Sequence, residues 1–161
     1  MIKKDDMNKI VIFDLDGTLA LIDKRRAIST KPNGKMNWIK FFDPKNINLD
    51  QPNTPVIKMA QMFKSQGFTV VIFSGRSNKT KDITKAWLDK HNVPFDVLRM
   101  RPSIHDWHFM PDYALKQFWL DSMFPDNIKD EILAVFDDRQ QVVDMWRDNG
   151  LFVFQVADGD F

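Results

Sequence analysis

The chain has 161 residues, a length that fits one domain with a sizeable core, and its hydrophobic content of 43% argues against intrinsic disorder. It contains no cysteine, which excludes disulfides and thiolate chemistry. The formal net charge of +1 says little about the class of partner. Because the longest apolar runs are only as long as a strand, we expect a soluble protein without a membrane segment. We place it in the cytoplasm, or in the host cytoplasm if the chain is viral.

Five short runs rich in β-branched and aromatic residues predict strands, and they are continuously apolar, as is typical of strands buried on both faces. They are Ile10–Phe13, Thr69–Phe73, Phe95–Leu98, Ile132–Phe136 and Leu151–Val156. Helical patterns lie between most of these runs, at Thr54–Gln66, Lys79–His91, Pro111–Met123 and Gln140–Asn149. The alternation predicts a single α/β domain over residues 1–161. We expect a three-layer, Rossmann-like fold in which helices cover both faces of a parallel sheet of about five strands.

One segment between the first strand and the first long helix interrupts this alternation. It holds about forty residues rich in Lys, Asn and Pro, and loops of that length inside compact domains are usually functional. We interpret residues 19–53 as a small cap that is inserted into the domain and lies over its functional site. Between Lys24 and Lys45 this segment carries seven basic residues and one acidic residue, whereas Asp121 to Asp148 carries eight acidic and three basic residues. The charge is therefore polarised along the sequence.

The cap segment also combines aromatic and basic residues. They are Trp38, Phe41 and Phe42 among Lys31, Lys35, Lys40 and Lys45. Aromatic rings interleaved with basic side chains suit base stacking combined with attraction to phosphate. The alternative is a short amphipathic helix whose aromatic face packs onto the domain. The pattern favours packing slightly for Phe42 and leaves Trp38 open.

Polar motifs directly follow three of the predicted strands. Asp14-Leu15-Asp16-Gly17-Thr18 follows the first strand, Ser74-Gly75-Arg76 the second, and Asp137-Asp138 the fourth. In a parallel sheet, ligands bind at the carboxyl ends of the strands, near the switch in strand order. We therefore expect the fold to bring these three motifs into one crevice.

The carboxylates in this crevice repel one another and need a cation, and their oxygen ligands favour a hard ion such as Mg²⁺. The Asp14 carboxylate is a competent nucleophile toward phosphorus and can form an aspartyl-phosphate. Asp16 can act as general acid to the leaving oxygen and then as general base to water. Gly17 permits the turn that the chain needs there.

Further residues supply donors for a phosphate group. Thr18 can offer a hydroxyl and an amide, and Ser74 and the amide of Gly75 add more donors. Lys116, on the helix expected near Pro111, can balance the charge on the nucleophile and on the transferred group.

These motifs, taken in order, resemble the haloacid dehalogenase-like phosphatase superfamily: Asp-x-Asp-Gly-Thr after a strand, Ser at the end of the next strand, a later Lys and a paired Asp. A closer resemblance, over nearly the whole chain, is to the phosphatase domain of bacteriophage polynucleotide kinase/phosphatase. The residues that carry it are Asp137–Arg147, Gln155–Phe161, Ser74-Gly75-Arg76 and Asp112-x-x-x-Lys116.

The resemblance implies roles for individual residues. The catalytic residues would be Asp14 as nucleophile, Asp16 as acid/base, and Lys116. Arg25 and Arg76 would contact the substrate or its phosphate, and Asp112 would orient Lys116. The metal ligands would be Asp14, Asp16 through its backbone carbonyl, Asp137 and Asp138.

We therefore expect a Mg²⁺-dependent phosphomonoesterase that acts on the 3′-phosphate of a nucleotide or a nucleic-acid end. One alternative is a phosphatase of free nucleotides or other small phosphorylated metabolites. Another is an inactive phosphate-binding or nucleic-acid-binding module, against which the presence of both Asp14 and Asp16 speaks. DNA, RNA and free nucleotide stay open as substrates, as does the oligomeric state.

Overall fold

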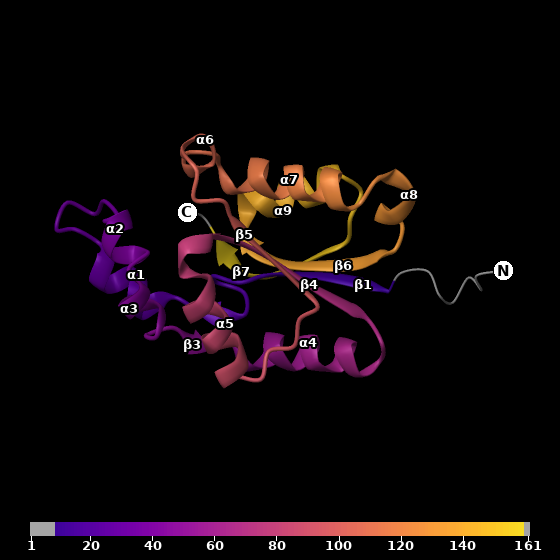
Figure 1. Ribbon diagram of the computed structural model, residues 1–161, viewed down its shortest axis with the longest axis horizontal. Helices are drawn as coiled ribbons and strands as arrows, with labels where there is room; N and C mark the ends of the chain where they lie inside the picture. Colours follow the sequence, from indigo (N-terminus) through magenta and orange to yellow (C-terminus); the bar gives the residue numbers. More distant parts are fainter. Residues whose placement is uncertain (1–8, 160–161) are drawn as a thin grey trace.

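The structure, a computed structural model, describes residues 9–159 and has a central sheet of five parallel strands (Figure 1). The strand order is β5-β4-β1-β6-β7. The strands are β1 (Ile10–Asp14), β4 (Thr69–Ser77), β5 (Val97–Arg101), β6 (Ile132–Arg139) and β7 (Val153–Gly159). This confirms the parallel α/β fold that the sequence predicts. β7 begins two residues later than expected, because the amide of Leu151 donates to the carbonyl of Trp146 at 3.2 Å and still belongs to the end of a helix.

Helices cover both faces of the sheet (Figure 1). α4 (Thr54–Ser65) and α5 (Lys81–Lys90) lie on one face, and α7 (Asp112–Met123) and α9 (Gln140–Asp148) lie on the other. The shorter helical segments outside the cap are η2 (Asn78–Thr80), α6 (His105–His108) and α8 (Asp126–Lys129). Among residues 9–159, none of the helices is both long enough and apolar enough to cross a membrane.

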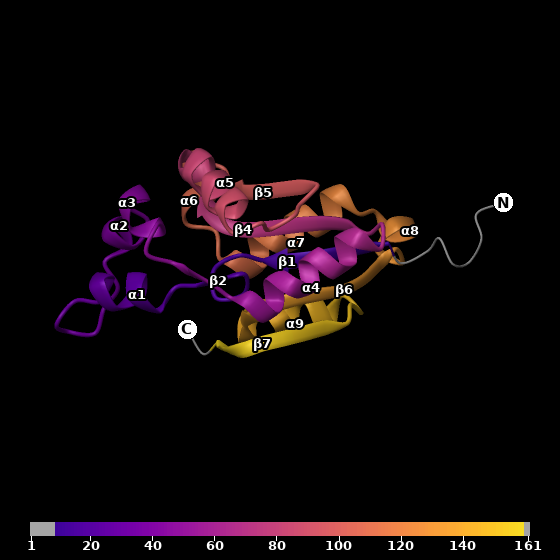
Figure 2. The same ribbon diagram turned by 90° about the horizontal axis from the view of Figure 1, so that it is seen from below.

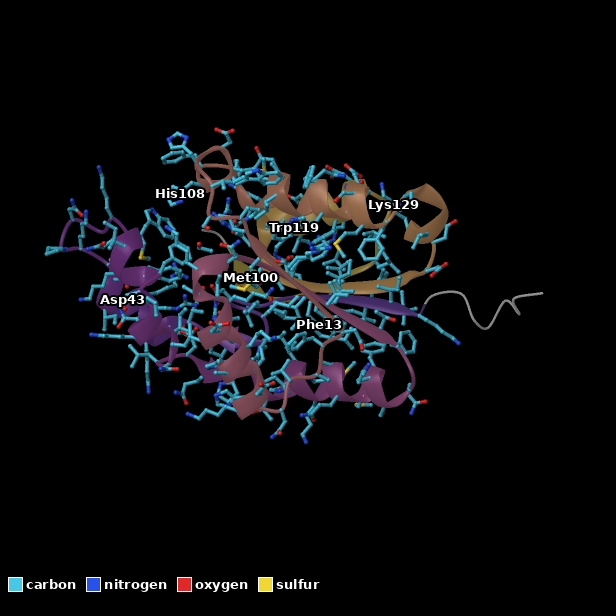
Figure 3. All side chains as sticks on the ribbon, in the orientation of Figure 1. Phe13, Asp43, Met100, His108, Trp119 and Lys129 are labelled. Atoms are coloured by element: carbon cyan, nitrogen blue, oxygen red, sulfur yellow. The ribbon has the colours of Figure 1, made fainter. Side chains whose placement is uncertain are left out.

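Two apolar clusters, one on each face, hold the layers together. Successive side chains of a strand point to opposite faces, so Val11 and Phe13 of β1 pack toward α4 and α5, whereas Ile12 packs toward α7 and α9. Phe13 and Trp119 accordingly lie on opposite sides of the sheet (Figure 3). The edge strand β7 is only partly buried, although the run that predicts it, Leu151–Val156, is rich in apolar residues. The central strands form a rigid base for the motifs at their ends.

The long insertion has its own secondary structure. β2 (Ala20–Leu21) and β3 (Gln51–Pro52) pair antiparallel at its base, and α1 (Asp23–Ser29), α2 (Trp38–Phe41) and α3 (Pro44–Ile47) lie between them. Figures 1 and 2 both place these three helices beyond the carboxyl ends of the sheet strands. The position agrees with our interpretation of residues 19–53 as a cap, which stays a prediction.

A substitution of Leu88 tests the importance of this core. Leu88 is fully buried in the apolar cluster between the sheet and the helices α4 and α5. We expect Leu88→Ala to lower the free energy of unfolding by about 2–5 kcal/mol, because it removes buried methyl groups and leaves a cavity. Urea denaturation followed by circular dichroism measures this change. The matched control is Ile39→Ala, at a side chain that is 88% exposed, where we expect a change within about 0.5 kcal/mol. Equal unfolding free energies for the two variants would contradict the assignment of the core.

Candidate active site

The acidic motifs meet at the carboxyl ends of β1 and β6. Asp14 is the last residue of β1, and Asp137 and Asp138 lie near the end of β6. Carboxylate oxygens of these three residues lie within 4.8 Å of one another, and all three side chains are buried. The pairing register shifts in β6 between Asp137 and Arg139 and in β4 between Ser74 and Ser77. Such irregularities re-aim side chains at the end of a strand. The motifs that begin at Ser74 and Asp137 are therefore part of the ends of β4 and β6, whereas the motif that begins at Asp14 continues into the turn after β1.

Lys116 brings a positive charge into this cluster from α7. Its Nζ donates to Oδ1 of Asp14 at 2.6 Å and to Oδ2 of Asp137 at 2.9 Å. Burial acts to lower the pKa of Lys116, but the nearby carboxylates of Asp137 and Asp14 outweigh it and raise the pKa above its ordinary value. Lys116 therefore stays protonated beside Asp14.

The cluster still carries an excess of negative charge, because three carboxylates face one ammonium group. Burial raises the pKa of Asp14 well above its ordinary value, against the opposing effect of Lys116. Burial and the neighbouring carboxylate of Asp137 likewise raise the pKa of Asp138 to about 6. A divalent cation would remove this repulsion, and a set of carboxylate oxygens is what Mg²⁺ prefers. The residues of the site therefore fit a hard divalent cation.

The Asp137 carboxylate is held by four donors. Its Oδ2 accepts from Lys116 and, at 3.1 Å, from the indole Nε1 of Trp146. Its Oδ1 accepts from the backbone amides of Asp138 and Arg139 at 3.0 and 3.3 Å. These bonds fix the carboxylate in place, so Asp137 orients Lys116.

Asp138 faces the opposite side of the cluster, toward Thr18 and Gly17. The Thr18 hydroxyl lies within donor distance of Oδ2 of Asp14, at 3.3 Å, and of Oδ1 of Asp138, at 3.4 Å. Gly17 has a φ of +86°, and a Cβ atom built there would lie 2.1 Å from Oδ2 of Asp138. The turn after β1 therefore needs glycine both for its backbone conformation and for the space that Asp138 occupies.

A second group of charges braces the start of α7. Oδ1 of Asp112 accepts from Arg101 at 2.5 Å and Oδ2 accepts from Arg139 at 2.9 Å. Arg101 also donates to the carbonyl of Gly75, at 3.1 Å, and a Cβ atom at Gly75 would lie 2.6 Å from Oδ1 of Asp112. The charge of Asp112 adds to the raised pKa of Lys116 one helical turn later. Asp112 thus acts on Lys116 through the placement of α7 and through its charge.

The two arginines singled out in the sequence converge on Asp16. Oδ1 of Asp16 accepts from Arg25 at 2.7 Å and from Arg76 at 2.9 and 2.5 Å. Although burial acts to raise it, Arg76 and Arg25 lower the pKa of Asp16 to about 2. Both arginines also bind Asp50, for which burial and the neighbouring Asp16 raise the pKa to about 6.

Residues 74 and 75, expected to bind phosphate, lie beside this group. The Ser74 side chain is buried, and its Oγ accepts from the backbone amide of Arg76 at 3.2 Å. The structure thus brings together, at one end of the sheet, all the residues that the sequence predicts for the site within residues 9–159. Asp160 and Phe161, the last residues of the C-terminal motif, lie outside the described residues.

Four residues of the site escaped the sequence analysis as functional residues: Asp50, Arg101, Arg139 and Trp146. Trp146 lies in the run that carries the resemblance, and its apolar spacing with Val142 on α9 gives only a core signal. Asp50 stands in a polar stretch of the cap segment, where nothing in the pattern indicates that its carboxylate is buried.

The chain matches one family over nearly its whole length. Residues 8–161 match the family model described as the polynucleotide kinase PNKP phosphatase domain. A protein of Autographa californica nuclear polyhedrosis virus, described as a bifunctional polynucleotide kinase/RNA ligase, is 32% identical over 152 residues. This match covers 89% of the present chain and 18% of the viral protein. The chain therefore spans less than a fifth of the length of this relative.

Solved structures show the same likeness. A chain in the structure of the Pnkp1/Rnl/Hen1 RNA repair complex superposes with a TM-score of 0.76 and 33% identity, covering 96% of the present chain and 44% of that chain. A haloacid dehalogenase-like hydrolase from Streptococcus pneumoniae gives a TM-score of 0.64 at 14% identity, covering 92% and 84% of the two chains. At 14% identity this second likeness shows the fold alone.

Gly17 and Gly34 provide a matched pair of variants for the turn after β1. Both have positive φ, +86° and +79°, but a Cβ atom at Gly34 would meet nothing within 4 Å. We expect Gly34→Ala and Gly17→Ala both to lose about 1–2 kcal/mol of stability from the backbone conformation. Only Gly17→Ala displaces Asp138, and we expect it to release phosphate from an aryl phosphate about 100-fold more slowly than the wild type. The measurement is the rate of phosphate release by each folded variant. Equal rates for Gly17→Ala and Gly34→Ala would contradict the role given to Gly17.

Proposed function

Because the chain belongs to the family of polynucleotide kinase PNKP phosphatase domains, we propose that it removes 3′-phosphates from nucleic-acid ends in a Mg²⁺-dependent reaction. The family and fold make it a haloacid dehalogenase-type phosphoric monoester hydrolase. The observation that carries the proposal is the contact between Lys116 and Asp14 inside a cluster of buried carboxylates. Burying these charges costs stability, and a site that reacts with phosphate is the simplest reason for a fold to retain them.

In the proposed mechanism Asp14 is the nucleophile. One of its carboxylate oxygens bonds to phosphorus while the bond from phosphorus to the ester oxygen breaks, and Asp16 gives a proton to that oxygen. Asp16 then takes a proton from water, and the water oxygen bonds to phosphorus while the bond from phosphorus to the Asp14 oxygen breaks. Inorganic phosphate leaves and the Asp14 carboxylate is restored. Lys116 stabilises the charge on Asp14 and on the transferred group.

The acid role of Asp16 places a condition on substrate binding. Arg76 and Arg25 hold the pKa of Asp16 near 2, so that in the resting site the carboxylate is ionised. A substrate phosphate that draws the two guanidinium groups toward itself weakens their bonds to Asp16 and lets its pKa rise. Contact of the two arginines with the substrate is therefore what allows Asp16 to act as an acid.

For the metal we propose Mg²⁺, held by the side chains of Asp14 and Asp138 and by the backbone carbonyl of Asp16. Asp137, whose two oxygens accept four hydrogen bonds, serves mainly to hold Lys116. When bound, the ion would neutralise negative charge on the carboxylates and on the phosphate oxygens.

A measurement of stability tests the metal separately from activity. We expect Mg²⁺ to raise the melting temperature of the wild type, by an amount equivalent to about 2.7 kcal/mol at 100 times the dissociation constant. Asp138→Asn should abolish this rise. Asp96→Asn is the control, because Asp96 pairs with Lys64 away from the site, and it should retain the rise.

Chelation gives the matching result for activity. Phosphate release should stop in a chelator, return with Mg²⁺ and return only poorly with Ca²⁺, which prefers higher and looser coordination. Full activity in the chelator, or an unchanged melting temperature with Mg²⁺ for the wild type, would remove the metal from the proposal.

The surface of the cap supports a polymeric substrate. Trp38 is 59% exposed, and its ring stacks on Phe42 with centroids 5.9 Å apart. Phe41, in contrast, is buried, and Cζ of Arg25 lies over its ring at 4.4 Å from the ring centroid. The same cap segment carries five exposed lysines, Lys24, Lys31, Lys35, Lys40 and Lys45. An exposed ring in a lysine-rich segment suits a base that stacks and the backbone phosphates that precede the 3′-terminal one.

The substrate test compares a 3′-phosphorylated oligonucleotide, the same oligonucleotide phosphorylated at its 5′ end, and a nucleoside 3′-monophosphate. We expect the enzyme to cleave the 3′-phosphorylated oligonucleotide most efficiently. We also expect its kcat/KM on this substrate to fall most steeply with salt, as measured by the slope of log kcat/KM against log salt concentration. Substitution of Lys35 and Lys40 together by Ala should flatten that salt slope by about two units at most. Trp38→Ala should weaken oligonucleotide binding by about 1–3 kcal/mol.

Two controls accompany this test. Lys58 and Lys85, exposed on α4 and α5, replaced together by Ala, should leave the salt slope unchanged. A preparation of Asp14→Asn should release no phosphate, which excludes a contaminating phosphatase. If the monophosphate is cleaved as well as the 3′-phosphorylated oligonucleotide, with the same salt slope, the chain is instead a phosphatase of small metabolites.

A further inference from the structure

Residues 102–110 join β5 to α7 and contain the short helix α6, and we call them the α6 loop. The loop carries several large side chains at its surface. Ile104 is 59% exposed and Phe109 is 76% exposed. The imidazole groups of His105 and His108 are exposed as well. Apolar and aromatic side chains that gather at one surface mark a binding site more often than those that are scattered singly.

The exposed aromatic rings of the loop gather around Phe109. The ring of His108 lies edge-to-face against that of Phe109, with centroids 5.0 Å apart and an angle of 89° between the planes. The ring of His105 meets Phe109 in the same manner, at 5.9 Å and 72°. Aromatic rings favour this arrangement. The two imidazoles therefore support the Phe109 ring without burying it.

Arg101, the last residue of β5, holds the α6 loop in place. One of its terminal nitrogens donates to the carbonyl of Trp107 at 2.7 Å and to that of Met110 at 2.6 Å. These two bonds lie on either side of Phe109 in the chain. Trp107 itself packs inward, against the apolar cluster between the sheet and α7. Because the loop is already fixed, Phe109 loses little conformational freedom when a ligand stacks on it.

Arg101 also ties the α6 loop to the active site. Its Nε donates to the carbonyl of Gly75 at 3.1 Å, and a terminal nitrogen donates to Oδ1 of Asp112 at 2.5 Å. Asp112 follows Phe109 by three residues, so their Cα atoms are at most about 11 Å apart. Phe109 therefore lies at the rim of the active site, near the motif around Gly75 that we expect to bind phosphate.

The α6 loop and the cap border the site at different places. Figures 1 and 2 show α6 and the cap helices at the same end of the sheet but apart from each other. α6 lies on the face of the sheet that α7 covers (Figure 1), and Figure 3 labels His108 of the loop and Asp43 of the cap at this end. Exposed aromatic rings thus come from two elements, Trp38 on α2 and Phe109 directly after α6.

The size of the ring cluster fits a nucleotide base. A stacked base covers the face of one aromatic ring, and every base has such a face, so that stacking tolerates any sequence. A stable protein interface, in contrast, takes about 800 Å² from each partner, which is far more than three rings of one short loop offer. A base of the strand whose 3′-phosphate enters the site can reach Phe109, because Phe109 lies at the rim.

We propose that Phe109 is a stacking platform for one base near the 3′ end of a nucleic-acid substrate. The inference rests on the function proposed above. The ring of Phe109 stacks on this base while the terminal phosphate lies against Asp14. Trp38 and Phe109 stand on separate elements and therefore take different bases. The enzyme thus grips the end of the strand on two sides of the scissile phosphate.

The test measures binding in a variant that cannot turn over. Asp14→Asn serves as the parent, and fluorescence anisotropy reports its affinity for a 3′-phosphorylated oligonucleotide labelled at the 5′ end. We expect the added substitution Phe109→Ala to weaken binding about 5- to 150-fold. Phe109→Trp, which keeps an aromatic face, should restore the affinity.

Phe152→Ala in the same parent is the matched control. Phe152 is 64% exposed and directly precedes β7, so it lies at the amino ends of the parallel strands, away from the site. This variant should bind the oligonucleotide as tightly as the parent. A loss as large as that of Phe109→Ala would show that any exposed phenylalanine gives the effect, and would overturn the proposal.

Oligonucleotides with an abasic site separate stacking from a displaced loop. The abasic site replaces, in turn, each of the three bases nearest the 3′-phosphate. At one position it should weaken binding to the parent and remove the difference between the parent and Phe109→Ala, because the ring then has no base to contact. Trp38→Ala should lose its effect at a different position. A loss with Phe109→Ala that persists at all three positions would contradict stacking, and one shared position would contradict separate bases.

The remaining outcomes separate this inference from the function on which it rests. If the wild type releases no phosphate from the 3′-phosphorylated oligonucleotide, the proposed function fails. If the wild type is active and Phe109→Ala binds the oligonucleotide as tightly as the parent, the stacking platform alone fails. If Phe109→Ala keeps its affinity and instead converts a dimer into a monomer in size-exclusion chromatography, the α6 loop is a contact between protein chains, and the inference is again overturned.

Discussion

The contact of Lys116 with Asp14 and Asp137 is the interaction on which the rest of the site depends. Carboxylates placed this close and this deeply repel one another, and one ammonium group offsets only part of that repulsion. The surrounding structure is arranged to maintain the contact. Trp146 and two backbone amides hold Asp137, and the salt bridges of Asp112 hold the start of the helix that carries Lys116. The remaining negative charge is what suits the site to a cation.

Much of this arrangement could be predicted from the sequence, because it follows from two periodic features. Continuously apolar strands alternating with helices specify a parallel sheet, and in such a sheet the residues that end the strands share one edge. Asp14, Ser74 and Asp137 each end an apolar run, so their convergence required no knowledge of side-chain contacts. The strand boundaries were less predictable, because Leu151 is as apolar as a strand residue and yet its amide closes a helix.

The partners of the charged residues could not be predicted in the same way. Burial of Asp50 depends on how the cap folds back onto α5, and that depends on contacts between residues far apart in the chain, such as Trp87 and Asp50. The resemblance assigns Arg25 and Arg76 to the substrate, whereas in the structure both bind carboxylates of the protein itself. Pattern and motif identify which residues are unusual, but the pairing among several candidates of opposite charge is decided by three-dimensional packing.

The short antiparallel pair of β2 and β3 makes the cap segment enter and leave the domain at neighbouring points. The amide of Asn53 donates to the carbonyl of Leu19 at 2.9 Å and closes the base of this stalk. A segment attached in this way can be exchanged for another without altering the sheet, which gives a modular route to new substrates. Arg25 and Asp50, however, lie near the two ends of the exchanged piece. A transplanted cap would have to carry an arginine and a carboxylate at equivalent places. The outer surface of the cap is therefore free to vary, whereas the residues at its base are not.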